Sequence, residues 1–194
     1  PREGLVAPLA RARNDLIDRL TEVRTGLQRG IAGAEAARSV LGGPSRYLVF
    51  VANNAEMRAG SGMFLLVGTL DAVGGRVHLG DLRPVTEVQV RPGAVPLGGD
   101  LAGRWGWLAP NQEWRNLMLS PRFDVNAALA AAMWEAAGRG RVDGVLAVDA
   151  VFLQEAMRAT GPVVVEGRRI GADGALREVL HDQYVRFGEA RAAR

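Results

Sequence analysis

The sequence predicts an α/β fold, in which helices cover a sheet, because strand-like and helix-like segments alternate over residues 44–194. Two apolar runs, Tyr47–Ala52 and Met63–Leu70, are short, continuous and rich in Val, Leu and Phe, which is typical of buried strands. A third run, Val142–Val148, has the same character and precedes a helix-like segment. These observations predict a buried sheet in the second, larger part of the chain.

The first part of the chain is predicted to be helical. Residues 5–40 carry apolar side chains every three or four positions, with Arg, Asp and Glu on the other face, as in an amphipathic helix. Gly26, Gly30 and Gly33 weaken the second half, so a break into two helices is expected there. Gly42–Pro44 ends the helical region. The predicted organisation is a helical segment over residues 1–43 and one domain over residues 44–194.

The middle of the chain is predicted to contain a hairpin and a long ordered loop. Asp71–Gly75 is a hairpin-type turn, Arg76–Leu79 is a return strand, and Thr86–Val90 is a further extended stretch. Residues 91–110 are rich in Gly and Pro and contain Trp105 and Trp107, and such side chains are costly to leave in water. This stretch is therefore expected to be an ordered loop.

Residues that typically begin or end helices indicate the bounds of the helices and strands after residue 120. They predict a helix from Asp124 as N-cap to Gly138, a strand over Val142–Val148, a helix capped by Asp149 that ends at Thr160, a strand over Val163–Val165, a turn over Gly167–Gly171 and a last helix from Asp173 to Phe187.

Composition indicates an ordinary globular protein, with 48% hydrophobic and 23% charged residues. The absence of cysteine excludes disulfides and thiolate metal sites, and the presence of only two histidines argues against the usual zinc sites. No run of 18 apolar residues is present. All 24 basic residues are Arg, which GC-rich codon usage would explain, although Arg is also the better bidentate ligand for phosphate.

A polar cluster lies between the first two predicted strands. It contains Asn53, Asn54, Glu56, Arg58 and Ser61, interrupted by glycines. Loops at strand ends often carry function because a rigid sheet positions them. We therefore expect this loop to form one wall of an anion-binding site.

Arginines at strand ends are the main chemical candidates. Arg58 precedes the second strand, and Arg83 follows the strand that pairs with it, so the two side chains could reach a common anion. The alternative is that Arg58 pairs with Glu56 and Arg83 with Asp81. A further basic edge, Arg186, Arg191 and Arg194, has the alternative of a solvated helix face. No catalytic triad, G-x-S-x-G motif or Walker A loop is present.

Four motifs in order carry a resemblance to a known group of proteins: NNAEMR from Asn53, LSP from Leu119, VDGVLAVD from Val142 and TGPVVVEG from Thr160. They resemble a little-characterised bacterial extracytoplasmic family that carries NNAE followed by Leu or Met and then Arg. That family is similar to the LytR–CpsA–Psr domains, which transfer glycopolymers from a polyprenyl pyrophosphate carrier to the cell wall. Those domains use arginines around the pyrophosphate and a divalent metal held by aspartate.

The resemblance implies a three-layer α/β/α sandwich with a central mixed sheet, and a set of site residues. Arg58 and Arg83 would hold the pyrophosphate, with Asp124 as a catalytic acid–base group and Asp81 as a ligand of Mg²⁺. This sequence departs from the pattern at Arg58–Ser61, which lacks the aspartate of the better-known domains. The implied substrate-binding residues are Asn53, Asn54, Ser61, Asn116, Arg186 and Arg191.

The resemblance also implies where the protein acts and on what. The expected partners are a polyprenyl-phosphate-linked glycan and a cell-wall polymer as acceptor, with no nucleic acid, because acids are interspersed among the basic residues. The domain would be extracytoplasmic and tethered to the bacterial membrane through a segment outside this chain, which is interpreted as part of a longer protein. The alternative is a non-catalytic cell-envelope module that recognises wall glycan or a protein partner through the tryptophans of residues 105–114.

Overall fold

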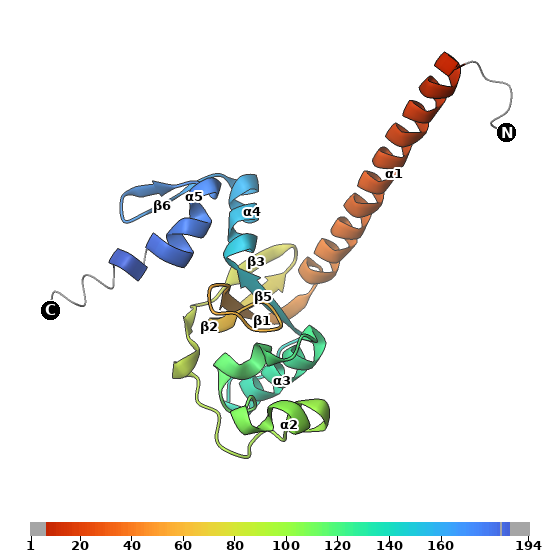
Figure 1. The fold of residues 1–194 in the computed structure, drawn as a ribbon. Coiled ribbons are helices and arrows are strands. Elements are labelled where there is room, and N and C mark those ends of the chain that lie inside the picture. Colours follow the sequence, from red (N-terminus) through yellow and green to blue (C-terminus); the bar gives the residue numbers. More distant parts are fainter. Residues whose placement is uncertain (1–6, 183, 187–194) are drawn as a thin grey trace. The chain divides into compact units, whose positions relative to one another are not determined.

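The computed structural model describes residues 7–182 and 184–186, and it confirms the α/β class with a central mixed sheet and an N-terminal helix (Figure 1). The chain divides into two compact units. One comprises residues 1–44 and 72–77, and the other comprises residues 45–71 and 78–194.

The first unit is dominated by helix α1, Ala7–Leu41. The predicted break near Gly26, Gly30 and Gly33 is wrong, because α1 runs without interruption through all three. Each glycine lowers the stability of the helix by about 1 kcal/mol relative to alanine but keeps its backbone hydrogen bonds, so the helix continues through it. The unit also contains the hairpin tip, where Gly74 and Gly75 have φ of 57° and 78°, as the predicted turn requires.

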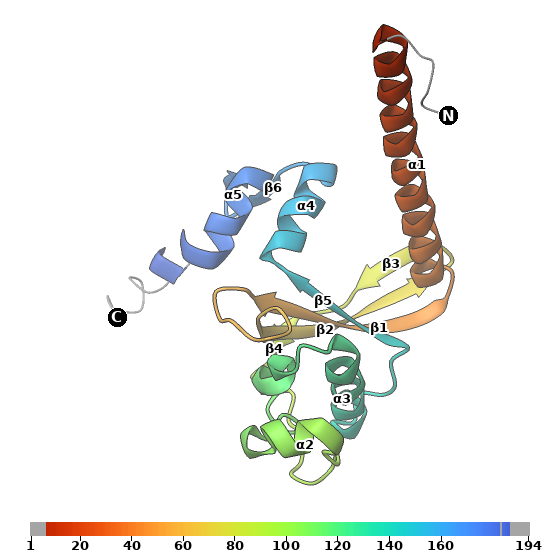
Figure 2. The same cartoon turned by 45° about the vertical axis from the view of Figure 1, so that its right-hand side comes forward.

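The sheet has the strand order β3-β2-β1-β5, with β4 paired to β2 (Figure 2). Strands β1 and β5 are parallel, whereas β2 and β4 are antiparallel, so the sheet is mixed. The strands predicted at Tyr47–Ala52, Met63–Leu70, Arg76–Leu79 and Val142–Val148 are confirmed as β1, β2, β3 and β5, whereas β4 was not predicted. Their bounds are β1 Pro44–Asn53, β2 Met63–Val73, β3 Arg76–Leu79, β4 Arg83–Pro84 and β5 Gly144–Asp149.

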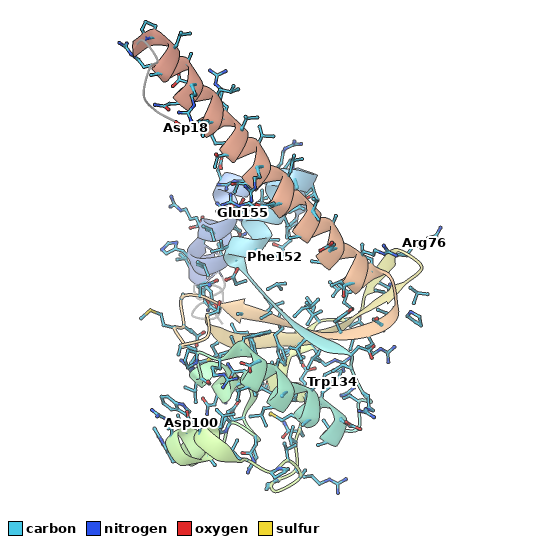
Figure 3. The ribbon with its side chains drawn as sticks, turned by 90° about the vertical axis from the view of Figure 1, so that its right-hand side faces the viewer. Asp18, Arg76, Asp100, Trp134, Phe152 and Glu155 are labelled. Atoms are coloured by element: carbon cyan, nitrogen blue, oxygen red, sulfur yellow. The ribbon has the colours of Figure 1, made fainter. Side chains whose placement is uncertain are left out.

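The core lies between the sheet and helix α3, Phe123–Ala136, which packs against β5 and covers one face in Figures 2 and 3. Phe50 of β1 stacks on Phe64 of β2 with ring centroids 4.2 Å apart, and Trp114 packs against Phe50. Met133 of α3 is fully buried in the same cluster. Helix α4, Ala150–Thr160, leaves the end of β5 on the other side of the sheet.

The stretch predicted as extended structure and an ordered loop contains short helices instead. Val85–Glu87 forms the 3-10 turn η1, Gly99–Trp105 forms α2 and Gly106–Leu108 forms η2, and beyond this stretch Trp114–Leu119 forms η3. Apolar residues spaced along the stretch, among them Val88 and Val95, enter the core at separate points. These separate buried side chains determine the local conformation. A repeating apolar pattern does not, so hydrophobic periodicity did not predict the helices.

After α4, the chain forms a second, two-stranded sheet. Strand β6, Val163–Val165, pairs antiparallel with β7, Arg168–Ile170. The predicted turn over Gly167–Gly171 is wrong, because the turn lies at Glu166–Gly167, with φ of 50° and 76°. Gly171, not Asp173, is the N-cap of the last helix, in which α5 spans Ala172–Arg177 and continues as the π-helical turn η4, Glu178–Asp182. Residues 184–186 are also helical, and the predicted end at Phe187 lies outside the described residues.

Replacing Trp114 with Phe is expected to lower the free energy of unfolding by about 1–2 kcal/mol. The Trp114 indole is 2% exposed, and its Nε1 donates to the Val88 carbonyl at 2.7 Å, so the variant leaves a buried acceptor unpaired. Trp107 is 79% exposed and supplies the control, since Trp107→Phe should change the energy by less than about 0.5 kcal/mol. Equal effects in urea denaturation would contradict the assignment of Trp114 to the core.

Candidate functional site

The candidate site lies at the carboxyl ends of the two parallel strands. Register pairs Ala52 of β1 with Asp149 of β5, so Asn53, the last residue of β1, and Asn54, which follows it, lie at the point where β5 ends. In α/β sheets, ligands bind outside the carboxyl ends of neighbouring parallel strands. The polar loop predicted from the sequence is therefore placed at the edge of the sheet where such sites form.

The Asp149 carboxylate accepts hydrogen bonds from several parts of this edge of the sheet. Its Oδ2 accepts hydrogen bonds from Asn54 Nδ2 at 2.9 Å and from Ser61 Oγ at 3.4 Å. Its Oδ1 accepts from the Phe152 backbone N–H at 2.8 Å, which confirms the predicted cap of α4. Burial opposes ionisation of Asp149, but the donors together outweigh it and hold the carboxyl pKa below its usual range. The carboxylate thus joins the β1–β2 loop to the start of α4.

Asn53 is 7% exposed and connects three parts of the site. Its Nδ2 donates to Glu56 Oε1 at 3.2 Å and to the Tyr184 hydroxyl at 3.0 Å. Its Oδ1 accepts from the Ala55 backbone N–H at 3.0 Å. Asn53 is therefore occupied by protein groups, and it links the loop to the region after η4.

The backbone of the β1–β2 loop is closely packed. Gly60 donates its N–H to the Met118 carbonyl at 3.1 Å, and a Cβ on Gly60 would lie 2.8 Å from Met118 Cε and 3.1 Å from the Ser120 carbonyl oxygen. Ser61 has φ of 142°, a value that L-residues rarely adopt. Backbone strain of this kind persists only where surrounding contacts enforce it, and it is concentrated at functional sites.

The positively charged guanidinium of Arg58 has no acidic partner among the described residues. Its Nη1 donates to the carbonyl of Met57 at 3.0 Å, and its Nε is buried without any hydrogen-bond acceptor. Glu56, the acid expected to neutralise it, instead accepts from Asn53. The alternative of an Arg58–Glu56 ion pair is therefore not observed.

Arg83 is half-buried at the start of β4, and its side chain forms no hydrogen bond or ion pair with any residue that the structure describes. Its register partner is Val67, and directly opposed residues of antiparallel strands share a face, so Arg83 emerges on the core side of β2. Val67 lies four residues after Met63, roughly 13 Å along the strand. The alternative pairing with Asp81 is absent, and the convergence of Arg83 with Arg58 stays a prediction.

Two of the predicted site residues have local structural roles. Asn116 donates from Nδ2 to the Leu108 carbonyl at 2.8 Å and so connects η3 to η2. Asp124, expected as the N-cap of α3, lies instead in its first turn and pairs with Arg122 at 2.5 Å. The hydrogen bond from Arg122 holds the pKa of Asp124 below its usual range. A carboxyl group with a lowered pKa is a weak general base.

Asp81 is exposed, and within the described residues no three His, Asp or Glu side chains gather in a group that could hold a metal. Mg²⁺ is usually held by one or two carboxylates together with substrate phosphates. A site of this kind needs fewer than three protein carboxylates, so the role of Asp81 as a ligand of Mg²⁺ stays a prediction.

Arg186 belongs to a cluster around one carboxylate. Glu178 forms ion pairs with Arg186 and with Arg168, the latter at 3.0 Å. These three side chains border a cavity of about 210 Å³ between α4, the β6–β7 hairpin and α5. Arg191 and Arg194 lie outside the described residues. The aliphatic lining of the cavity includes Leu153, Met157, Val163, Val165, Ile170 and Val179.

Comparison with known families decides the classification. Residues 42–184, more than half of the chain, match the family described as protein of unknown function (DUF4012). The chain belongs to the DUF4012 family. Curated proteins and solved structures give no significant match. No helix among the described residues of this DUF4012 domain is long and apolar enough to cross a membrane.

The matched region contains three features of the site that sequence reasoning missed. Asp149 was predicted to cap α4, but its contacts with the β1–β2 loop were not foreseen. Tyr184 and the Arg168–Glu178 pair were not singled out. The parallel pairing of β1 with β5 could have indicated Asp149, because it places the last residue of each strand at one edge of the DUF4012 sheet.

Proposed function

We propose that this domain binds a (poly)prenyl pyrophosphate-linked glycan, with the pyrophosphate against Arg58. One observation carries the proposal: the Arg58 guanidinium has no acidic partner among the described residues, and its Nε is buried without an acceptor. A buried donor left unpaired costs about 1–3 kcal/mol, and a phosphate oxygen would satisfy it. The fork of the guanidinium also fits phosphate in a bidentate manner.

Arg83 supplies a second cation whose charge no described acid neutralises. If the side chains of Arg58 in the β1–β2 loop and Arg83 in β4 converge, they favour an anion with more than one negative group. The resemblance to LytR–CpsA–Psr domains supports a pyrophosphate as that anion, because those domains hold one with arginines.

The cavity between α4 and the β6–β7 hairpin supports a prenyl chain as the apolar part of the ligand. Its walls are mainly aliphatic, and Arg168 and Arg186 border it. The Asn53–Tyr184 hydrogen bond brings the region of Arg186 next to the β1–β2 loop. At about 210 Å³ the cavity is smaller than typical ligand pockets of roughly 300–1,000 Å³, so it would hold only the first isoprene units.

Transfer of the glycan to a cell-wall polymer is the further step that the resemblance suggests. An acceptor hydroxyl oxygen would bond to the glycan-side phosphorus, the bridging P–O bond would break, and polyprenyl phosphate would leave. Arg58 and Arg83 would stabilise the developing charge. Asp124 is paired with Arg122 and has a lowered pKa, so it is poorly suited to take the hydroxyl proton. Binding is therefore better supported than phosphotransferase activity, and an extracytoplasmic, membrane-tethered location belongs to the same proposal.

The test is binding of farnesyl pyrophosphate, measured by titration calorimetry with inorganic pyrophosphate in parallel. Arg58→Ala and Arg83→Ala are each expected to weaken binding about tenfold or more, because each removes a charge-assisted hydrogen bond worth about 1.5–3 kcal/mol. Farnesyl pyrophosphate should bind more tightly than inorganic pyrophosphate if the apolar cavity takes the chain.

Arg139→Ala is the matched control, since Arg139 is exposed after α3 and the substitution removes the same charge. It should bind like the wild type. The proposal fails if the wild type binds neither ligand, or if all three variants bind equally.

A second candidate is a non-catalytic module that recognises wall glycan. Trp107 is 79% exposed, which is unusual for so large an apolar side chain. Nearby, Trp105, Asp100, Ser120 and Arg122 border a cavity of about 290 Å³ that combines an aromatic ring with polar groups. Co-sedimentation with purified peptidoglycan tests this function, and Trp107→Ala should abolish it while leaving farnesyl pyrophosphate binding unchanged. Retention of the variant on the polymer would exclude Trp107 as the contact.

A further inference from the structure

Helix α1 presents an apolar stripe that nothing described in its own compact unit covers. Its residues are each 57–63% exposed: Leu9, Leu16, Leu20, Val23, Leu27 and Ile31. Leu9, Leu20 and Ile31 are 11 residues apart, as are Leu16 and Leu27. A repeat of 11 residues in three turns stays close to the period of a straight helix, so the stripe follows one face of α1 along its length.

The stripe needs a partner for physical reasons. A helix outside a protein core gains most of its stability from packing an amphipathic face, not from intrinsic propensity. Three glycines inside α1 lower that propensity further. A contiguous apolar surface of this kind marks an interaction site.

Four of the six stripe residues have a spacing that is symmetric when read in either direction. Residues 16, 20, 27 and 31 are arranged about a midpoint between Val23 and Arg24. Two copies of α1 that run in opposite directions would therefore bring Leu16 of each copy to Ile31 of the other, and Leu20 to Leu27. An interface that uses the same patch on both subunits is isologous, as in most homodimers. We infer that α1 pairs in an antiparallel manner with α1 of a second copy of this chain.

Charges beside the stripe support the antiparallel direction. Arg13, Arg24 and Glu35 follow the 11-residue repeat along one flank of α1. In an antiparallel pair this flank meets itself, so Arg13 of each copy faces Glu35 of the other, and Arg24 faces its own equivalent at the two-fold axis. A parallel pair would instead bring Arg24 close to Arg19 and would leave Glu35 without a cation. Two favourable contacts against one unfavourable contact favour the antiparallel arrangement.

The oligomeric state of the whole chain, measured by sedimentation equilibrium, tests the pairing. The wild type is expected to dimerise. Arg13→Glu and Glu35→Arg should each weaken the dimer at least threefold, and the double variant should restore it, because the exchange recreates the two contacts. Arg29→Glu, on the opposite face, makes the same charge change as Arg13→Glu and should leave the dimer unchanged.

The direction can be read from disulfide trapping, since the chain has no native cysteine. Arg24→Cys lies at the two-fold axis and should cross-link with its own equivalent. Ile31→Cys should not, because its partner position is residue 16, and residues 16 and 31 are about 22 Å apart along a helix. A monomer at all concentrations would overturn the inference and indicate that a different segment or protein covers the stripe. Cross-linking of the Ile31→Cys variant but not of the Arg24→Cys variant would also overturn it.

Discussion

Asp149→Ala is expected to lower the free energy of unfolding by about 2–3 kcal/mol. The substitution removes the N-cap of α4, worth about 1 kcal/mol, and leaves Asn54 Nδ2 and Ser61 Oγ without their shared acceptor. Ser61 has a strained φ of 142°, so we expect the loop to change conformation once that contact is lost. Urea denaturation followed by circular dichroism measures the change.

Asp173→Ala is the matched control for this prediction. Asp173 is an exposed carboxylate in the first turn of α5, so its loss should cost less than about 0.5 kcal/mol. If both variants lose the same stability, the network at Asp149 contributes nothing beyond a general effect of removing negative charge.

The Asp149 contribution should also depend on pH. The folded state lowers the pKa of Asp149, so the stabilisation is complete above the unfolded carboxyl pKa of about 3.9 and is lost as pH falls through the lower, folded value. The stability difference between the wild type and Asp149→Asn should therefore be constant above about pH 5 and shrink below about pH 4. A difference that stays constant down to about pH 2.5 would show that the charge of Asp149 plays no part.

Gly62→Ala is expected to destabilise the protein by about 3 kcal/mol. A Cβ at this position would lie 2.5 Å from the carbonyl oxygen of Asn53 and 3.1 Å from the backbone nitrogen of Asn54, so backbone atoms must move. The movement would shift the end of β1 and the loop that carries Arg58. Binding of farnesyl pyrophosphate should weaken together with stability.

Gly98→Ala separates this steric effect from the general effect of adding a methyl group. Gly98 has an extended backbone with φ of −130°, and no atom lies within 4 Å of an added Cβ. The variant should be as stable as the wild type within about 0.5 kcal/mol. A Gly62→Ala protein of wild-type stability would show that the β1–β2 loop is not as closely packed as the structure indicates.

Sequence patterns revealed the strands well because each strand is a local, continuous apolar run. Tyr47–Ala52, Met63–Leu70 and Arg76–Leu79 all lie within observed strands, and the Gly74–Gly75 turn follows from the need for positive φ. The break predicted in α1 failed because glycine propensity is a weak local effect.

Only part of the site could be predicted, because its residues come into contact through the pairing of strands that are far apart in the sequence. The loop at Asn53–Ser61 was identified from its polarity, but the contact of Asn54 with Asp149 spans 95 residues. Whether Arg58 and Asp124 form ion pairs depended on which nearby group of opposite charge was free. Glu56 was taken by Asn53, and Arg122 was available to Asp124, and neither choice is visible in the order of residues.

The hydrogen bond between Asn53 and Tyr184 joins residues that are 131 positions apart, so it closes nearly the whole domain into one loop. Such a closure must overcome chain entropy, and contacts of high sequence separation make folding slow. The family match ends at this same residue, Tyr184. During synthesis, therefore, Asn53 is made long before Tyr184. The hydrogen bond between them can form only after the last residue of the family segment has been added.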